Sequence, residues 1–377
     1  MTFRVKYDII VYVGERTISD AGRGGPMHTF EPDYRNLQGA ARNVECQRIP
    51  LYEHIIASSV LEAILGRKFA HLAEGDEADR REYFRVYAGF LRDHGYDVVP
   101  YECCITDVLP GGGALGRHVQ GIIRAREDFD RYPWKEIPDL FFRKFSPMFR
   151  ALRQTMPPGM MAVGGVGNGV FECVQDLTGY IDLCYMREDD PELYRDMFRA
   201  VGDMMAAIWT RFLREFGDIY CVLRFGDDLG FATGTLLIPD DIRSLVIPRY
   251  KVIIDKVHAA GKPFLLHSCG HIFDVMEDLI AAGIDAKHSN EDKIAPFPEW
   301  VERYGDRIGN FGGIDMNCLC EMDRAQMREY IEDVVRKCRG RGGFAFGTGN
   351  SIAEYVPPEG YLNMIEIFRE LRGETSF

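Results

Sequence analysis

Two side chains that bind transition metals stand two residues apart in one apolar stretch of the sequence. They are His267 and Cys269 in FLLHSCGHIFD, residues 264–274. We expect both at the end of a β-strand, where residues i and i+2 point to the same side. An imidazole nitrogen and a thiolate suit zinc, although a catalytic zinc ion takes three protein ligands. The alternative is that Cys269 packs beneath a turn at Gly270 and His267 hydrogen-bonds a backbone carbonyl.

Other polar side chains follow apolar stretches in the same way. Asp227 and Asp228 end the stretch IYCVLRFGDD, and alternation lets only one of them face inward. That carboxylate is open to binding substrate, ligating metal or acting as a base, whereas capping the next element is the alternative. The further candidates for substrate binding at strand ends are Glu53, His54, His288, Asp315 and Asn350.

Four other positions carry weaker signals. Asp107 precedes the glycine-rich segment PGGGALG, which lacks the GxGxxG spacing of a dinucleotide-binding loop. Glu172 is expected to open a helix, where a carboxylate interacts favourably with the helix dipole. Cys318 and Cys320 follow Asp315 and are within reach of the same pocket, although burial is the simpler expectation.

The elements that must position these residues alternate regularly from about residue 158. Amphipathic helices are predicted at 191–216, 239–260, 324–338 and 358–371. Short apolar strands are predicted at 48–54, 160–167, 219–228, 263–270, 284–289, 307–315 and 343–350. Alternating strands and helices predict a parallel sheet, and a number of units approaching eight favours a (β/α)8 barrel.

In such a barrel the carboxyl ends of all strands face one mouth, where active sites are built. This geometry would gather the candidate residues named above. We expect residues 1–47 to form an N-terminal extension with an entry helix, and residues 48–377 to form a single barrel.

The composition excludes several classes of function. The net charge of −13 leaves no surplus of Lys and Arg to neutralise phosphates, so we expect no nucleic acid partner. No apolar run is long enough to span a bilayer, and the N-terminus shows no export signal. The ten cysteines are not densely spaced, which is typical of free thiols in a reducing cytoplasm. A cytoplasmic location without membrane contact is the expectation.

Several motifs resemble the uroporphyrinogen decarboxylase superfamily, and its corrinoid-linked methyltransferase branch in particular. They are RNLQGAARNVECQRIP (35–50), ITDVLPGGGALG (105–116), GDDLGFATGTLLIPDDIRSLVIPRYK (226–251), KPFLLHSCGHI (262–272), YGDRIGNFGGID (304–315) and GTGNSIAEYVPPEGYLNMI (347–365). The resemblance extends over about residues 34–371. It implies a (β/α)8 barrel, in agreement with the alternation of strands and helices.

The decarboxylases of this superfamily carry an arginine-rich RQAGR segment that holds substrate carboxylates. This chain has LYEHIIAS there, so the cationic clamp is missing. Asp107 does match the catalytic aspartate of the decarboxylases' FSDIL motif. A lyase acting on a tetrapyrrole is therefore an alternative, with Asp107 as its catalytic residue.

The methyltransferase branch holds zinc with a His-x-Cys pair and a later cysteine. The resemblance implies zinc ligands at His267 and Cys269, but the later cysteine's place falls near Thr348. The candidates for the third ligand are Glu53, Asp228, Cys318 and Cys320.

The function implied is transfer of a methyl group from a small methylated donor, such as a methoxylated aromatic, to the cobalt of a corrinoid protein. Zinc or an acid would activate the leaving group, with Asp228 and His267 in catalytic roles. The alternatives are the lyase, a methylcobamide:thiol methyltransferase, and a binding protein that kept the barrel without the chemistry. Family members are often dimers, so a homodimer is one expected assembly.

Overall fold

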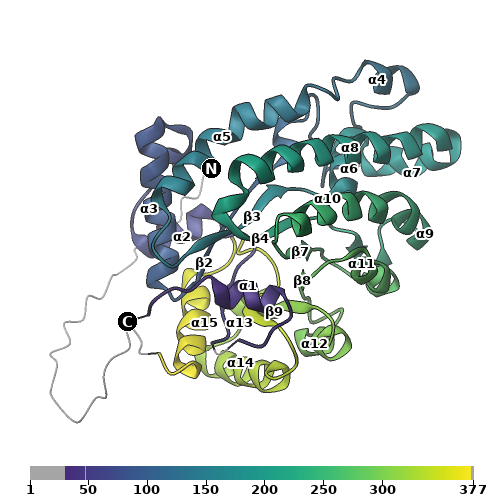
Figure 1. Cartoon of the computed structure of the whole chain (residues 1–377). Helices are drawn as coiled ribbons and strands as arrows, with labels where there is room; N and C mark the ends of the chain where they lie inside the picture. The colour runs from purple at the N-terminus through teal and green to yellow at the C-terminus, as the bar shows by residue number, and fades with distance from the viewer. Residues whose placement is uncertain (1–29, 47, 375–377) are drawn as a thin grey trace, which may run out of the picture.

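The architecture is a barrel of parallel strands surrounded by helices (Figure 1). The structure is a computed structural model that describes residues 30–46 and 48–374. Eight strands form one sheet in the order β1-β10-β9-β8-β7-β4-β3-β2, and every pairing within it is parallel. The predicted (β/α)8 barrel is confirmed. The strands are β1 (Leu51–Tyr52), β2 (Val98–Cys104), β3 (Met161–Gly167), β4 (Tyr220–Gly226), β7 (Phe264–His267), β8 (Ala286–His288), β9 (Gly309–Ile314) and β10 (Phe344–Thr348).

Helices cover the outside of this sheet and bury their apolar faces against it. A short antiparallel hairpin, β5 (Gly230–Phe231) and β6 (Gly234–Thr235), follows β4. The longer helices are α2 (Ser58–Leu65), α3 (Glu77–Asp93), α5 (Ile137–Thr155), α6 (Val170–Thr178), α7 (Tyr180–Asp189), α8 (Pro191–Phe216), α10 (Ile247–Ala259), α11 (Met276–Ala282), α12 (Phe297–Tyr304), α14 (Arg324–Cys338) and α15 (Pro358–Leu371). The shorter ones are α4 (Arg126–Arg131), α9 (Pro239–Asp241) and α13 (Met316–Glu321).

Local sequence signals set several helix starts. Asp76 and Asp323 form capping boxes at the first turns of α3 and α14. Asp190 caps α8, whose first residue is Pro191. These signals satisfy backbone N–H groups that have no partner within the helix, and the predicted helices 191–216, 324–338 and 358–371 are confirmed.

The N-terminal end of the barrel is closed by α1 (Arg35–Ala41), which crosses the strands in Figure 1. Leu37, Ala40 and Ala41 pack with the inward side chains of the strands in a core of their own. The Gln38 side chain donates to the Cys221 carbonyl at 3.0 Å. The predicted entry helix is therefore part of the barrel floor, whereas residues 1–29 of the predicted extension lie outside the described residues.

The barrel is closed incompletely between β1 and β2. These strands end the sheet order, and no backbone ladder joins them in the part of the chain that the structure describes. The hydroxyl of Tyr87 on α3 donates to the Pro100 carbonyl of β2 at 3.0 Å. An edge strand tolerates Pro100, which has no N–H to give to a neighbour.

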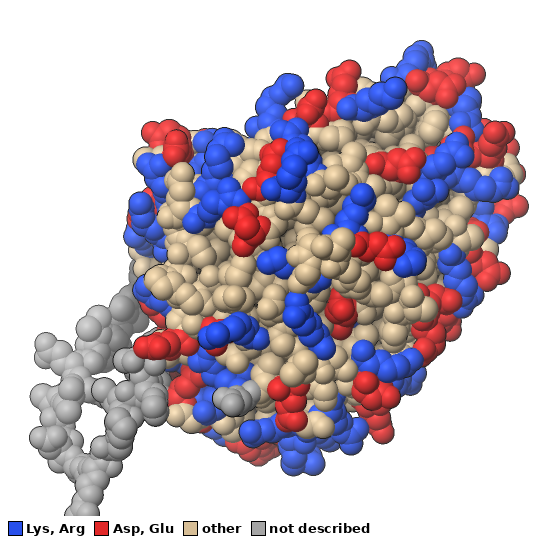
Figure 2. All heavy atoms as spheres, in the orientation of Figure 1, with Lys and Arg blue, Asp and Glu red and all other residues tan. Residues whose placement is uncertain are grey.

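Charged side chains of both signs are interspersed over the face shown in Figure 2, which carries no broad basic field. Many charged side chains of the described residues form ion pairs, such as Arg307 with Glu277 at 2.6 Å. A search of the described residues finds no helix with the length and apolar character needed to cross a bilayer.

Candidate active site

Three potential metal ligands converge at the mouth, the end of the barrel where the strands' carboxyl ends lie. His267 is the last residue of β7, Cys269 follows it, and Asp228 follows β4. His267 Nε2 lies 3.4 Å from Cys269 Sγ and 3.7 Å from Asp228 Oδ1. One ligand atom from each residue falls within 4.8 Å of the others. We call Asp228, His267 and Cys269 the metal-ligand group.

Hydrogen bonds from one backbone N–H and two side chains hold this group in place. The Cys269 N–H donates to Asp228 Oδ1 at 3.0 Å, which links the two strand ends. The Asn350 side-chain N–H donates to Cys269 Sγ at 3.1 Å, and the Ser289 hydroxyl reaches the same sulfur at 3.7 Å. The thiol therefore has two polar neighbours that would stabilise a thiolate.

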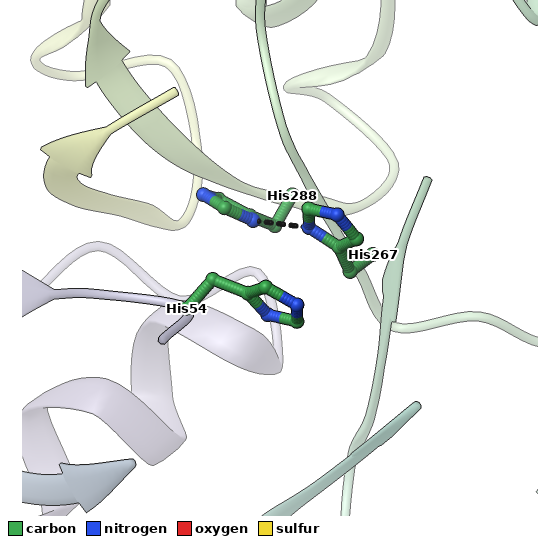
Figure 3. A group of neighbouring side chains, drawn as sticks. All are labelled: His54, His267 and His288. Carbon is green, nitrogen blue, oxygen red and sulfur yellow. Dashed lines mark hydrogen bonds between the residues drawn. The ribbon is translucent and has the colours of Figure 1, made fainter. Parts of the chain in front are cut away.

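A second group, the histidine cluster, consists of His54, His267 and His288 (Figure 3). The His54 and His267 rings stack with centroids 3.7 Å apart and an angle of 5° between their planes. Nδ1 of His267 lies 2.7 Å from Nδ1 of His288, and Nε2 of His288 lies 2.9 Å from the Thr348 carbonyl oxygen. His267 thus belongs to both groups.

Burial determines the protonation of these side chains. It is the largest cause that lowers the pKa of His54 and His267 well below the usual range, and it lowers that of His288 to about 3. Neutral imidazole is the form that binds metal. Burial, with the nearby Asp228 carboxylate, raises the pKa of the Cys269 thiol. A cation at this place would offset both effects and favour the thiolate.

Glu53 and Thr348 form a separate contact at the end of β1 and β10. The Thr348 hydroxyl is hydrogen-bonded to Glu53 Oε2 and lies 2.5 Å from the Asn350 carbonyl oxygen. Tyr96 donates to Glu53 Oε1 at 3.0 Å. Burial raises the pKa of the Glu53 carboxyl to about 7. The side chain at position 348 thus faces Glu53, and neither residue belongs to the metal-ligand group.

Two carboxylates that were predicted to bind substrate accept backbone N–H groups at helix starts. Asp227 is fully buried and accepts the N–H groups of Phe171 at 2.9 Å and Glu172 at 2.8 Å, at the start of α6. Asp315 caps α13 by accepting the Asn317 N–H at 2.7 Å. Both carboxylates thus support helix starts, and their binding of substrate stays a prediction.

Asp107, Cys318 and Cys320 also lie outside the metal-ligand group. Asp107 is exposed on a 3-10 turn after β2, and its carboxylate lies 3.8 Å from Lys144 Nζ. Cys318 is buried in α13, and Cys320 is exposed there. Of the four candidates for a third ligand, the structure brings only Asp228 to His267 and Cys269 among the residues it describes.

A buried ion pair that the sequence patterns did not predict lies in the barrel interior. The Arg224 guanidinium on β4 donates to Glu102 Oε2 at 2.7 and 2.9 Å, to the Tyr52 hydroxyl at 2.6 Å and to the His54 carbonyl at 3.1 Å. Arg224 is the one charged residue in the apolar strand YCVLRFG. A charge inside a buried strand requires a partner, and that signal was available in the sequence.

Glu172 makes contacts that its predicted place at a helix start did not indicate. It opens α6, as predicted, but its carboxyl accepts the Asn168 side-chain N–H at 2.8 Å and the Asp228 N–H at 3.3 Å. Burial, together with the charges of Asp227 and Asp228, raises its pKa well above the usual range. Burial and these charges thus favour the protonated form of the carboxyl beside the metal-ligand group.

A pocket of about 330 Å³ opens at the incompletely closed side of the barrel. Its walls carry the rings of Tyr83, Tyr87 and Tyr101 and the side chains of His54, Glu102 and Arg224. Gly226 on β4 lies beside the histidine cluster, where a Cβ would be 3.3 Å from His267 Cδ2. The pocket borders His54, whose ring stacks on His267 in the histidine cluster.

The residues at the mouth fit a zinc ion. One nitrogen, one sulfur and one carboxylate oxygen make the kind of three-ligand set that catalytic zinc sites use, with a position left for substrate. Asp228 has a side chain that is 45% exposed, which keeps this side of the group open to the mouth.

Comparisons with known proteins agree with this architecture. A methyltransferase from Methanosarcina mazei is 15% identical, with a TM-score of 0.67, over 90% of this chain and 99% of that chain. A Listeria monocytogenes protein assigned as a vitamin-B12-independent methionine synthase is 14% identical, with a TM-score of 0.50, over 87% of this chain and 98% of that chain. A search of curated proteins gave no match.

These structural likenesses establish the fold, and the family follows from the sequence. The family model of uroporphyrinogen decarboxylase (URO-D) matches residues 94–371, which is well over half of the chain. The chain therefore belongs to the uroporphyrinogen decarboxylase family.

Proposed function

We propose that this protein is a methyltransferase that moves a methyl group from a small methylated donor to the cobalt of a corrinoid protein. The observation that carries the proposal is the convergence of Asp228, His267 and Cys269 at the open mouth. The likeness to the Methanosarcina mazei methyltransferase supports it. The missing arginine clamp argues against porphyrinogen decarboxylation, and Asp107, the proposed centre of a lyase, faces Lys144 on the rim.

Each side chain has a defined part in this proposal. His267, Cys269 and Asp228 would hold zinc, which when bound would act as a Lewis acid on the donor's leaving group. Asn350 supports the Cys269 sulfur with its N–H. Glu172, whose raised pKa favours a protonated carboxyl beside Asp228, would be the acid available to a leaving oxygen or nitrogen. When the bond from the methyl carbon to the leaving oxygen or nitrogen breaks, its electron pair stays on that oxygen or nitrogen. Cobalt(I) supplies the electron pair for the new bond to the methyl carbon.

The donor's place in this proposal is the pocket between β1 and β2. A volume of about 330 Å³ suits a small molecule, and the tyrosine rings offer flat apolar surfaces. A methoxylated aromatic compound is therefore the first donor to test. A thiol acceptor in the same mouth is the remaining alternative within this reaction class.

Metal content tests the ligand assignment. We expect the full-length protein to contain one zinc ion per chain by atomic spectroscopy, and Cys269→Ser and Asp228→Asn to lose most of it. Cys320→Ser is the matched control, since this exposed thiol is also a sequence candidate but lies outside the group. Equal zinc in Cys269→Ser and wild type would refute the assignment.

Spectroscopy tests the reaction. The protein is mixed with a cobalt(I) corrinoid protein and a panel of methoxylated aromatics, and formation of methylcobalt is followed by absorbance. We expect a signal that depends on both the donor and Cys269. Absence of the signal across the panel, with zinc present, would argue against this donor class, and turnover of a porphyrinogen would establish the lyase alternative.

A further inference from the structure

The two ring nitrogens of His267 have different partners. Nε2 faces the metal-ligand group, 3.4 Å from Cys269 Sγ, whereas Nδ1 faces away from it, 2.7 Å from Nδ1 of His288 (Figure 3). A neutral imidazole carries one proton, so only one of its nitrogens offers a lone pair. Which nitrogen that is decides whether His267 can ligate a metal together with Cys269.

The contacts of His288 settle the direction of the hydrogen bond. Its Nε2 lies 2.9 Å from the Thr348 carbonyl oxygen, which can only accept, so Nε2 carries the proton. His288 is fully buried, and the hydrogen-bond partners of its ring among the described residues are the Thr348 carbonyl and His267 Nδ1; because neither is a carboxylate that would stabilise a charged ring, the imidazole is neutral. Its Nδ1 is therefore bare and must accept the N–H of His267 Nδ1. The Nε2 atom of His267 is then left with its lone pair.

The acceptor at Thr348 is itself firmly placed. Thr348 ends β10, which is paired with β9, and its backbone N–H donates to Glu53 Oε2 at 3.3 Å. Its hydroxyl is hydrogen-bonded to the same carboxyl oxygen. A chain of contacts therefore runs from Glu53 through Thr348 and His288 to His267.

His54 restrains the same ring from its face. The parallel stack at 3.7 Å leaves little room for the His267 ring to tilt, and His54 Nδ1 has no hydrogen-bond partner among the described residues. Stacking rather than hydrogen bonding is therefore its contribution. The ring of His267 is fixed in plane by His54 and in tautomer by His288.

We infer that His288 is a positioning residue, which holds His267 in the Nδ1–H tautomer and thereby directs the Nε2 lone pair toward Cys269 and Asp228. That this lone pair serves a metal ion rests on the proposed function, whereas the tautomer itself does not. Groups of this kind behind a metal ligand commonly change metal affinity by about 10- to 100-fold when they are removed.

Three substitutions of His288 separate its role as acceptor for His267 from its role as donor to Thr348. Asparagine places an amide oxygen near the former Nδ1 position and keeps the acceptor for His267. Glutamine places an amide N–H near the former Nε2 position and keeps the bond to Thr348 while removing the acceptor. Leucine removes both. His288→Asn and His288→Gln are matched in polarity and burial, so a purely structural role would affect them alike.

The first measurement needs no metal. The metal-free full-length protein is labelled with [15N]histidine, and the ring nitrogen shifts of His267, assigned with a His267→Gln sample, give its tautomer. We expect Nδ1–H in wild type and His288→Asn, and loss of that preference in His288→Gln and His288→Leu. Nε2–H in the wild type, or the same tautomer in all variants, would overturn the inference.

The second measurement addresses the use of the lone pair. Co2+ is titrated into the same proteins and the thiolate-to-cobalt charge-transfer band is recorded. We expect affinity about 10- to 100-fold weaker for His288→Gln and His288→Leu, with His288→Asn close to wild type. Equal losses for asparagine and glutamine would overturn the positioning role. No band in wild type, with the tautomer as expected, would refute the metal in the proposed function and leave the tautomer standing.

Discussion

At the scale of single residues, Thr348 bears on which side chain would be the third metal ligand. The resemblance left the third ligand open, because a threonine stands near the place of a cysteine. In the structure the Thr348 hydroxyl faces Glu53, and Asp228 from another strand lies beside His267. Under the proposed function, the Asp228 carboxylate would take the place of a third thiolate, while the Thr348 backbone carbonyl contacts His288.

Thr348→Cys tests that interpretation directly. A thiol at this position would point at the Glu53 carboxyl, so we expect no gain in Co2+ affinity. Loss of a hydrogen bond to a buried carboxyl should lower the free energy of unfolding by about 1–3 kcal/mol. Urea unfolding and cobalt titration measure the two quantities. A clear gain in affinity with a stronger charge-transfer band would instead place residue 348 among the ligands.

The protonation of Glu53 makes a prediction about pH. Burial raises the pKa of this carboxyl from 4.5 to about 7 in the folded protein. The unfolded chain therefore loses its proton first as the pH rises, so the stability contribution is full below pH 4.5. It is lost between pH 4.5 and about 7, and it levels off above.

Glu53→Gln removes this titration while keeping a group that can hydrogen-bond Thr348. The free energy of unfolding of the variant minus that of wild type should rise by about 3 kcal/mol from pH 4.5 to 7.5. Other buried carboxyls titrate in both proteins, so their contributions cancel in this difference. Glu192→Gln, on the exposed start of α8, is the control and should show no such rise. A flat difference for Glu53→Gln would show that Glu53 is ionised in the fold.

At the scale of elements, local sequence patterns predicted some strands and helices and missed others. Apolar runs and helix caps predicted the strands after residue 158 and the helices at 191–216, 239–260, 324–338 and 358–371, because these signals are local. The same patterns placed His267 and Cys269 on one side of β7. Neither pattern predicted β2 or α5, since Pro100 and Pro147 interrupt them. Tertiary contacts compensate for a proline at an edge strand or inside a long helix, and those contacts are invisible in a local window.

Carboxylates were the least predictable part of the site for the same reason. Asp227 and Asp228 are neighbours, yet one caps α6 and the other faces His267. Alternation predicted that they diverge but not which one turns inward, because the answer depends on where α6 begins. Glu172 followed the rule for a helix start and also contacts Asp228, so a capping role did not exclude a place at the mouth.

A glycine on β4 is the element-scale feature that we expect to matter most for the ligand geometry. A Cβ at Gly226 would lie 3.3 Å from His267 Cδ2, closer than ordinary packing allows. Gly226 is not among the glycines with positive φ, so alanine causes no backbone strain. Gly226→Ala should displace the His267 ring slightly and weaken Co2+ binding by about tenfold, as loss of a supporting contact does.

The control is Gly217→Ala, at the end of α8, where the nearest contact of a new Cβ would be an ordinary 3.6 Å to Leu213. Cobalt titration and urea unfolding are compared for both variants. If Gly226→Ala binds Co2+ like Gly217→Ala, the His267 ring has more room than the structure indicates.

At the scale of the whole molecule, side chains complete the closure that the backbone leaves open. β1 and β2 end the sheet order, and Arg224 on β4 reaches both of them through the Tyr52 hydroxyl, the His54 carbonyl and Glu102. This arrangement leaves room for the pocket of about 330 Å³ while holding its floor. A fully paired sheet would be more regular but would leave no such pocket there. A homodimer stays a prediction from the family resemblance.

Breaking that closure should cost far more than breaking a surface ion pair. Arg224→Leu leaves Glu102 buried without a counter-ion, and we expect a loss of about 3–5 kcal/mol in the free energy of unfolding. Arg224→Leu combined with Glu102→Gln removes the unpaired charge and should recover part of the loss. Lys251→Ala, which breaks an exposed pair with Asp255, is the control and should change stability by less than about 1 kcal/mol. Urea unfolding of wild type and the three variants measures these free energies. If Arg224→Leu loses no more free energy of unfolding than Lys251→Ala, the closure of the barrel does not depend on this ion pair.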